Sequence, residues 1–393
     1  MTMTTSTTTD RSAVKLPKAA LAALTAVGLR CGGLSPLARL QPGPQPPDAG
    51  ALRQVLTGLP ATFTGCMPAL LDPQLTVLFL AGDGVGSLAG QYLWNDRDGA
   101  SPGFQLSVQP EDLTLAGPVD LTVVALSLQD RLSLGSVVEP APLGFSLTAG
   151  EFWVLTALLD AYRDARLRRQ LARIGGTPVG VAAGDVRAMW LAGRSVTNLG
   201  WGVSLFSSML PDAAPADFEA ALDGVLTALE EAELVARLRG ESNDPLGDVL
   251  LLGDSLQALA EGVSNAVLFG LAVQRVRQPG QAEVLTLGGW RTPGGIWLAD
   301  FCDLDEDRVT LSLVGPGFFT GLLDVALNPA TTEPAAPSVA DARYTVAGLL
   351  AALEGAPAPA PAATSGTHFC TQCGQPLNQG AQFCRSCGAP AHA

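Results

Sequence analysis

The chain has 393 residues, 47% of them hydrophobic, and a formal charge of -14 at pH 7. This apolar content is enough to form the cores of ordinary globular domains and argues against intrinsic disorder. The negative charge repels phosphate backbones and anionic lipid wherever no basic patch overrides it, so the composition disfavours nucleic acid as a partner.

The cysteines indicate a reducing compartment. Four of the seven cysteines lie in the C-terminal tail, whereas Cys31, Cys66 and Cys302 are scattered without paired spacing. This distribution is not a disulfide framework, and paired thiolates that remain available to a metal are typical of a reducing environment. We therefore expect a cytoplasmic protein.

The N-terminal segment allows two interpretations. Three basic residues precede an apolar run from Ala19 to Leu29, and Cys31 follows shortly after, as in a signal peptide or lipoprotein signal. Arg30, however, stands where a small residue is expected, and the first ten residues are polar. We therefore favour a short amphipathic helix. Elsewhere the sequence has no run of 18 apolar residues, so no membrane span is expected.

Two proline-rich segments predict the domain boundaries. Residues 41–48 (QPGPQPPD) resist both helix and sheet, and residues 356–367 (APAPAPAATSGT) should form an extended linker. We accordingly expect an N-terminal tail with a short helix at 1–50 and an α+β body at 51–355. The linker at 356–367 would then lead to a separate module at 368–393.

Short identities at an offset of 190 residues suggest a duplication within the body. Val77-Leu78-Phe79 recurs as Val267-Leu268-Phe269, and Gly90-Gln91 recurs as Gly280-Gln281. These identities predict repeats at 65–175 and 255–330, each a meander of strands followed by a helix. Chance similarity in a chain rich in Ala, Leu and Gly remains the alternative.

Alternating or apolar segments supply the strands of each expected repeat. In the first copy they are 104–108 and 121–126, and in the second they are 296–299 and 309–314. The helix that closes each copy would contain Thr156 to Asp160 in the first and Thr320 to Asp324 in the second. The expected architecture is thus a duplicated β-meander-plus-helix unit.

Helices are expected between the two copies. Six large residues fall at helical spacing on the first helix, namely Phe152, Leu155, Leu158, Leu159, Tyr162 and Leu171. A second helix follows Pro215, and a hairpin then joins 234–238 to 249–252. This order resembles a winged helix. The helix in the recognition position carries only acidic charges, namely Asp217, Glu219, Asp223, Glu230, Glu231 and Glu233, so it would repel a DNA groove.

A GxGxxA pattern at residues 84–89 is the motif that most resembles an enzyme site. It follows an apolar strand, 75–80, as the glycine loop of a dinucleotide-binding fold does. The segment after it, 87–94, is short for a crossover helix. We therefore favour a hairpin loop over a nucleotide site.

Much catalytic chemistry is excluded from the body. Both histidines, His368 and His392, lie in the tail, and both lysines, Lys15 and Lys18, lie near the N-terminus. Residues 19–367 therefore cannot supply a Ser-His-Asp triad, a Cys-His pair, a Schiff-base lysine or a P-loop lysine. We expect a protein that is not an enzyme.

The tail carries two copies of one short unit, FCTQCG and FCRSCG. They place Cys370, Cys373, Cys384 and Cys387 in two Cys-x-x-Cys pairs, and two such turns can close a tetrahedron of thiolates around Zn²⁺. This stretch resembles the short zinc-ribbon modules of prokaryotic (bacterial) proteins. The four cysteines are the predicted ligands of one zinc ion, and a closed four-cysteine shell leaves no open position, so the metal is expected to be structural.

Together these observations favour an intracellular adaptor or scaffold that binds other proteins. The alternatives are a regulator of winged-helix ancestry and, third, an enzyme that uses the glycine loop. The identity of the protein partners and homo-oligomerisation stay open.

Overall fold

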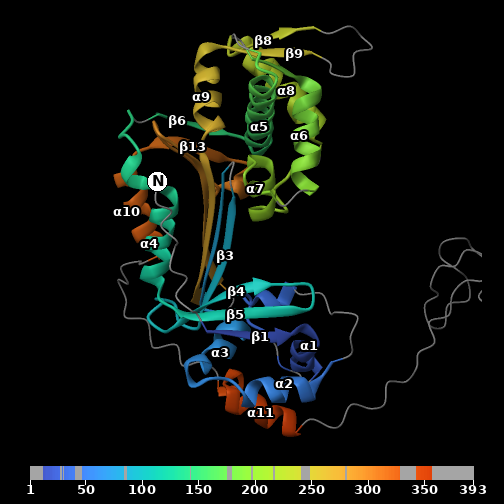
Figure 1. The fold of residues 1–393 in the computed structure, drawn as a ribbon, viewed down its shortest axis with the longest axis vertical. Coiled ribbons are helices and arrows are strands. Elements are labelled where there is room, and N and C mark those ends of the chain that lie inside the picture. Colours follow the sequence, from blue (N-terminus) through green and yellow to red (C-terminus); the bar gives the residue numbers. More distant parts are fainter. Residues whose placement is uncertain are drawn as a thin grey trace, which may run out of the picture. The chain divides into compact units, whose positions relative to one another are not determined.

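The computed structural model describes residues 12–26, 29, 31–39, 47–83, 86–141, 143–174, 179–195, 198–215, 217–239, 248–278, 281–327 and 342–355 (Figure 1). They form helices and antiparallel strands, so the expected α+β class is confirmed. By contacts the chain divides into two units, Met1–Leu350 and Ala351–Ala393. Within the described ranges, no helix is long and apolar enough to cross a membrane.

A ten-stranded antiparallel sheet is the centre of the first unit. Its strand order is β1-β5-β4-β3-β2-β10-β11-β12-β13-β6. The strands are β1 (Ala13–Pro17), β2 (Leu75–Gly82), β3 (Ser87–Trp94), β4 (Gly103–Val108), β5 (Asp112–Val119), β6 (Leu143–Leu147), β10 (Val267–Gln278), β11 (Gln281–Thr292), β12 (Gly295–Asp300) and β13 (Val309–Val314). Four of them contain the expected strands at 75–80, 104–108, 296–299 and 309–314.

The order of elements repeats within this sheet. A first half runs from α3 (Cys66–Leu71) through β2, β3, β4 and β5 to α4 (Leu121–Leu132). A second half runs from α9 (Asp254–Ser264) through β10, β11, β12 and β13 to α10 (Pro316–Leu327). The first strands of the two halves, β2 and β10, pair antiparallel, so the strand order is symmetric about this pair.

The expected strand at 121–126 was wrong. Leu121 to Leu126 are the start of α4, so the four strands of the first half are followed by this helix, ahead of the helix that contains Asp160. The Asp120 side chain accepts a hydrogen bond from the Thr122 N–H at 2.7 Å and caps α4. Leu121, Val124 and Leu128 are buried at helical spacing, so burial overrides the strand-like run of β-branched residues.

Helices cover both faces of the sheet (Figure 1). On one face, α4 and α10 contact each other and pack on strand residues that include Val77 and Val273. The other face belongs to a core formed mainly by α5 (Ala149–Leu171), α6 (Ala183–Ser195), α7 (Gly202–Met209), α8 (Phe218–Glu231) and α9. The expected helices at 320–324 and after Pro215 correspond to α10 and α8.

Helix α5 is the central helix of the second core. Every residue from Phe152 to Tyr162 is buried, so the helix has no exposed face over three turns. Leu171 was expected on its apolar face, but 77% of this residue is exposed. The reason is that the buried part of α5 ends well before its last turn.

A second sheet of three strands lies beside these helices. Its strands are β7 (Gly180–Ala182), β8 (Val235–Leu238) and β9 (Val249–Leu252), in the order β7-β9-β8. The antiparallel pair β8–β9 confirms the expected hairpin. The segment therefore runs from one strand through helices α6, α7 and α8 to a hairpin whose last strand lies in the middle of the sheet. This order keeps the helix-and-hairpin succession from which the sequence predicted a resemblance to a winged helix.

The N-terminal segment contributes to the same unit. Helix α1 (Lys18–Ala26) corresponds to the expected short helix, and it packs against α2 (Ala49–Thr57). Strand β1 pairs with β5, and Leu16 is fully buried. The residues before Ala51 are therefore not only a tail, because they supply one edge of the large sheet. The last described element is α11 (Val346–Gly355).

Candidate functional site

The four predicted zinc ligands, Cys370, Cys373, Cys384 and Cys387, lie outside the described residues. In the described part of the chain, no group of three or more His, Cys, Asp or Glu side chains could hold a metal ion. The thiols of Cys66 and Cys302 are poor nucleophiles. Burial raises the pKa of Cys66 to about 12, and partial burial together with the nearby Asp300 raises that of Cys302, whose surface is still exposed, to about 11.

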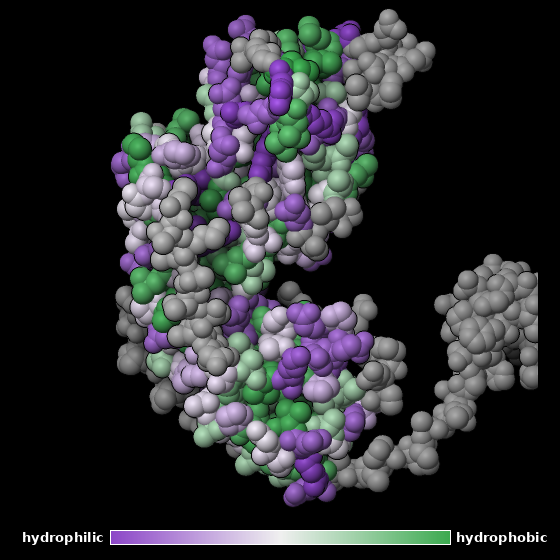
Figure 2. Space-filling view, in the orientation of Figure 1, coloured by the Kyte–Doolittle hydropathy of each residue, from purple (hydrophilic) through white to green (hydrophobic). Residues whose placement is uncertain are grey.

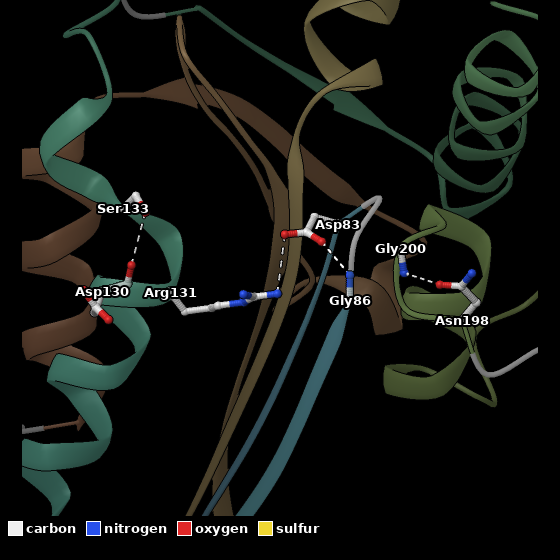
Figure 3. Close-up of polar contacts among 7 residues, drawn as sticks. All are labelled: Asp83, Gly86, Asp130, Arg131, Ser133, Asn198 and Gly200. Atoms are coloured by element: carbon white, nitrogen blue, oxygen red, sulfur yellow. Dashed lines mark hydrogen bonds and ion pairs between the residues drawn. The ribbon is translucent and has the colours of Figure 1, made fainter. Parts of the chain in front are cut away.

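The glycine loop is the tip of a hairpin. Strands β2 and β3 pair antiparallel from Leu75 opposite Trp94 to Gly82 opposite Ser87, which confirms the hairpin interpretation. The Asp83 side chain accepts a hydrogen bond from the Gly86 N–H at 2.8 Å and stabilises the turn (Figure 3). Because a strand follows the loop, no helix N-terminus is present here to bind a phosphate group.

A second segment of backbone packs onto this hairpin tip. A methyl group placed on Gly82 would lie 2.1 Å from the carbonyl oxygen of Leu199, and one on Gly200 would lie 2.5 Å from the carbonyl oxygen of Asp83. Both glycines therefore allow two main chains to approach more closely than side chains would permit. The second segment turns at residues 198–200, where the Asn198 side chain accepts a hydrogen bond from the Gly200 N–H at 3.0 Å (Figure 3).

An ion pair joins the hairpin tip to the opposite side of the sheet. Arg131 of α4 lies 3.5 Å from the Asp83 carboxylate, and Figure 3 shows its side chain extended toward the loop. Both side chains are about one-third exposed, so the pair contributes little stability. The loop is therefore held mainly by the hydrogen bond between Asp83 and the Gly86 N–H.

A buried carboxylate anchors the segment that covers the hairpin. Asp160 of α5 accepts hydrogen bonds from the N–H groups of Gly202 at 3.0 Å and Val203 at 2.9 Å, at the start of α7. Burial raises the pKa of Asp160 to about 6, although both hydrogen bonds and the nearby Arg163 oppose this shift. Arg163 itself donates a hydrogen bond to the Gly200 carbonyl and lies over the Trp201 ring.

Sequence reasoning missed the role of Asp160. A single aspartate between apolar residues of a long helix was the available signal, because a buried acid needs partners. A raised carboxylate pKa often marks an active site, but both oxygens of Asp160 are used by α7, and the residue is 3% exposed.

A large apolar groove provides a different kind of site. Its volume is about 810 Å³, and it opens between α9 and strands β12 and β13. Its lining consists of Leu143, Arg166, Leu234, Ser255, Leu256, Ala258, Leu259, Glu261, Gly262, Asn265, Thr292, Pro293, Gly294, Trp297 and Leu313. Only Arg166 and Glu261 among them carry a charge. Figure 2 shows that apolar patches reach the surface between polar regions.

A smaller hollow adjoins the same edge of the sheet. It has a volume of about 450 Å³ and shares Leu143 and Leu313 with the groove. Its other lining residues are Glu139, Pro140, Gly144, Ser312, Val314, Gly315 and Phe318. Leu143, Phe318 and the nearby Val138 are each more than half exposed. Together they make an accessible apolar area at the end of the large sheet, as at many protein-binding surfaces.

Comparison with known protein families identifies the C-terminal module. A family model described as a zinc-ribbon domain matches residues 369–391, which include all four predicted ligands. This match confirms the zinc ribbon and implies zinc binding, which the donor set of two Cys-x-x-Cys pairs fits. No curated protein matches the chain.

Proposed function

We propose that the protein is a cytoplasmic, non-catalytic adaptor that binds other proteins at the groove between α9 and β12–β13. The observation that carries this proposal is the lining of the groove, where apolar residues predominate and only Arg166 and Glu261 are charged. Such a lining can bury apolar side chains of a partner, and it contains no histidine or lysine that could activate the hydroxyls of Ser255 and Thr292.

The regulator interpretation has weaker support. Helix α8 occupies the recognition position of the winged-helix-like segment, and its exposed residues include Glu219, Asp223, Glu230 and Glu231. Four carboxylates on one helix would repel DNA phosphates. The winged-helix-like segment is therefore assigned here to protein contacts.

The zinc ribbon would add a small, rigid second module. In this proposal one Zn²⁺ is held by Cys370, Cys373, Cys384 and Cys387, and it has a structural role because four thiolates complete its coordination. A linker rich in Pro and Ala would keep the ribbon separate from the body.

A pair of matched variants tests the adaptor function. Ala258 lines the groove in the middle of α9, and Ala188 is an exposed alanine in the middle of α6. Affinity capture of the full chain with crosslinking should recover a protein that Ala258→Asp loses and Ala188→Asp retains. The proposal fails if no protein is recovered, or if the two variants retain the recovered protein equally.

A further inference from the structure

Among the described strands, one edge of the large sheet is open. Strand β6 ends the sheet there and pairs with β13 alone, from Leu147 opposite Val309 to Leu143 opposite Leu313. Beyond this ladder, the main chain of residues 143–147 makes no hydrogen bond to another described residue. Its outward N–H and C=O groups can therefore pair with a further strand.

The two edges of the sheet differ in how they are protected. Strand β1 at the far edge has the sequence AVKLP, and Lys15 and Pro17 are the residue types that discourage strand pairing at an edge. Strand β6 has the sequence LGFSL, without a charge or a proline. An uncharged edge of this kind is usually covered in a folded protein.

A row of apolar side chains runs across the sheet and stops at this edge. Trp290 lies opposite Trp297, which lies opposite Leu313, which in turn lies opposite Leu143. Exposure increases along the row, because Trp290 is 1% exposed and Leu143 is 56% exposed. Since directly opposed residues share one face, the next strand would place a side chain beside Leu143, at the mouth of the groove.

The neighbouring position provides space on the other face. Gly144 lies opposite Ser312, which lies opposite Leu298 of the core under α4 and α10. Gly144 has no side chain, and Phe318, which lines the hollow beside it, is 61% exposed. An added strand would therefore meet apolar surface on both faces at alternate residues.

We propose that β6 accepts an extended segment of a partner protein as an eleventh strand, with apolar side chains two residues apart and a basic flank. This inference rests on the proposed function, because Leu143 lines the same groove. The charge favours a basic partner. Glu139 lies beside the start of β6, and Asp307 accepts a hydrogen bond from Ala149 just beyond its end. A second copy would bring the same carboxylates and another charge of -14, so it is the weaker occupant.

The test uses peptides of about ten residues, long enough for one strand, selected from a random display library on the full-length protein. The selected peptides should alternate apolar with other residues and carry Lys or Arg at one end. Two series of each peptide are then N-methylated at every second amide, one at the odd positions and one at the even positions. Binding should be abolished in the series whose methylated amides face β6 and kept in the other series. Leu143→Asn should weaken binding about tenfold or more. The matched variant is Leu126→Asn on α4, where 57% of the residue is exposed, and its binding should stay within about twofold.

Three results would overturn strand addition: no selected peptide, equal loss in both methylated series, or unchanged binding by Leu143→Asn. The capture experiment with Ala258→Asp reports independently on protein binding. If it succeeds while the methylated series lose binding equally, the adaptor function stands and the strand mode is wrong.

Discussion

Leu80 lies directly opposite Gly270 in the β2–β10 pair, and these two residues are 190 positions apart (270 − 80), the offset that separates the repeated sequence motifs. The neighbouring pairs are reciprocal. Phe79 lies opposite Leu271, and Ala81 lies opposite Phe269, which is the counterpart of Phe79 at the same offset. The two halves of the sheet therefore meet through equivalent residues, as expected for a local two-fold arrangement.

Helix α7 packs on both strands of this pair and reaches the neighbouring strand β11. Gly270 lies opposite Gly288 of β11, and a methyl group on Gly288 would lie 2.6 Å from the Phe206 ring. We expect Gly288→Ala to lower the free energy of unfolding by about 1–3 kcal/mol through overpacking, as measured by denaturant titration. In a protein that also carries Phe206→Leu, the same Gly288→Ala change should lower the free energy of unfolding by less, because the aromatic ring that the methyl group meets is absent. Equal costs in the two backgrounds would contradict this packing.

The hairpin glycines provide a prediction with an internal control. Gly82→Ala should destabilise the protein by about 3 kcal/mol or more, because the new methyl group meets backbone that cannot rotate away. Gly86→Ala should change stability by only about 0.5 kcal/mol, because nothing lies within 4 Å of the added group. Thermal unfolding of both variants distinguishes them. Similar melting temperatures would show that Leu199 does not pack on the hairpin tip.

The same loop should have no affinity for nucleotides. Gly82 and Ser87 are paired strand residues on either side of it, so the loop lacks the helix whose amides would bind a pyrophosphate. Calorimetric titration with NAD, FAD and ATP should give no binding heat. Micromolar binding that Gly86→Ala weakens would revive the enzyme interpretation.

Local sequence signals predicted much of the sheet. The strands at 75–80, 104–108 and 309–314 and the glycine hairpin were found because alternation and turn residues are local properties. Residues 121–126 were misassigned, since a run with two valines has the same composition in a strand and in a buried helix. Only Asp120, which precedes the run and is of a residue type that caps helices, distinguished a helix from a strand.

Non-local packing accounts for the rest. The β2–β10 pair joins residues about 190 apart, and only the repeated motifs hinted at it. The groove could not be predicted because its lining comes from α9, β12, β13 and β6, whose proximity depends on the complete fold. The zinc ribbon, in contrast, could be predicted because two Cys-x-x-Cys pairs are typical of this module without further context.

Zinc binding should depend on the paired cysteines. Protein purified without chelator should contain one zinc per chain, and Cys384→Ser should lose most of it, because three thiolates hold the ion less tightly than four. Elemental analysis measures both. Cys302→Ser is the control, since this exposed cysteine lies in the body. Undiminished zinc in the Cys384 variant would exclude the assigned ligand set.

The body should fold without the ribbon. A chain that ends at Gly355 keeps every described helix and strand, including both apolar cores. Its main unfolding transition should therefore match that of the full chain within about 0.5 kcal/mol. Calorimetry of the two proteins provides the comparison. A large fall in the transition midpoint would mean that the ribbon stabilises the body.

The contribution of the Asp160 carboxyl to the free energy of unfolding should fall as the pH rises. Its pKa in the folded chain is about 6, above the ordinary value of 3.8, so the folded state binds this proton more tightly than the unfolded state. The resulting stabilisation is complete below about pH 4 and is lost as the pH rises through about 6. Its magnitude is on the order of 3 kcal/mol.

Asp160→Asn isolates this contribution, because every other titrating group is common to both proteins. Between pH 4 and pH 7 the free energy of unfolding of the wild-type chain should fall relative to that of Asp160→Asn. The reason is that the buried carboxyl ionises over this range and burial penalises its charge. Denaturant titrations at several pH values measure the difference. A difference that stays constant across this range would mean that the hydrogen bonds from Gly202 and Val203 offset the burial of Asp160 completely.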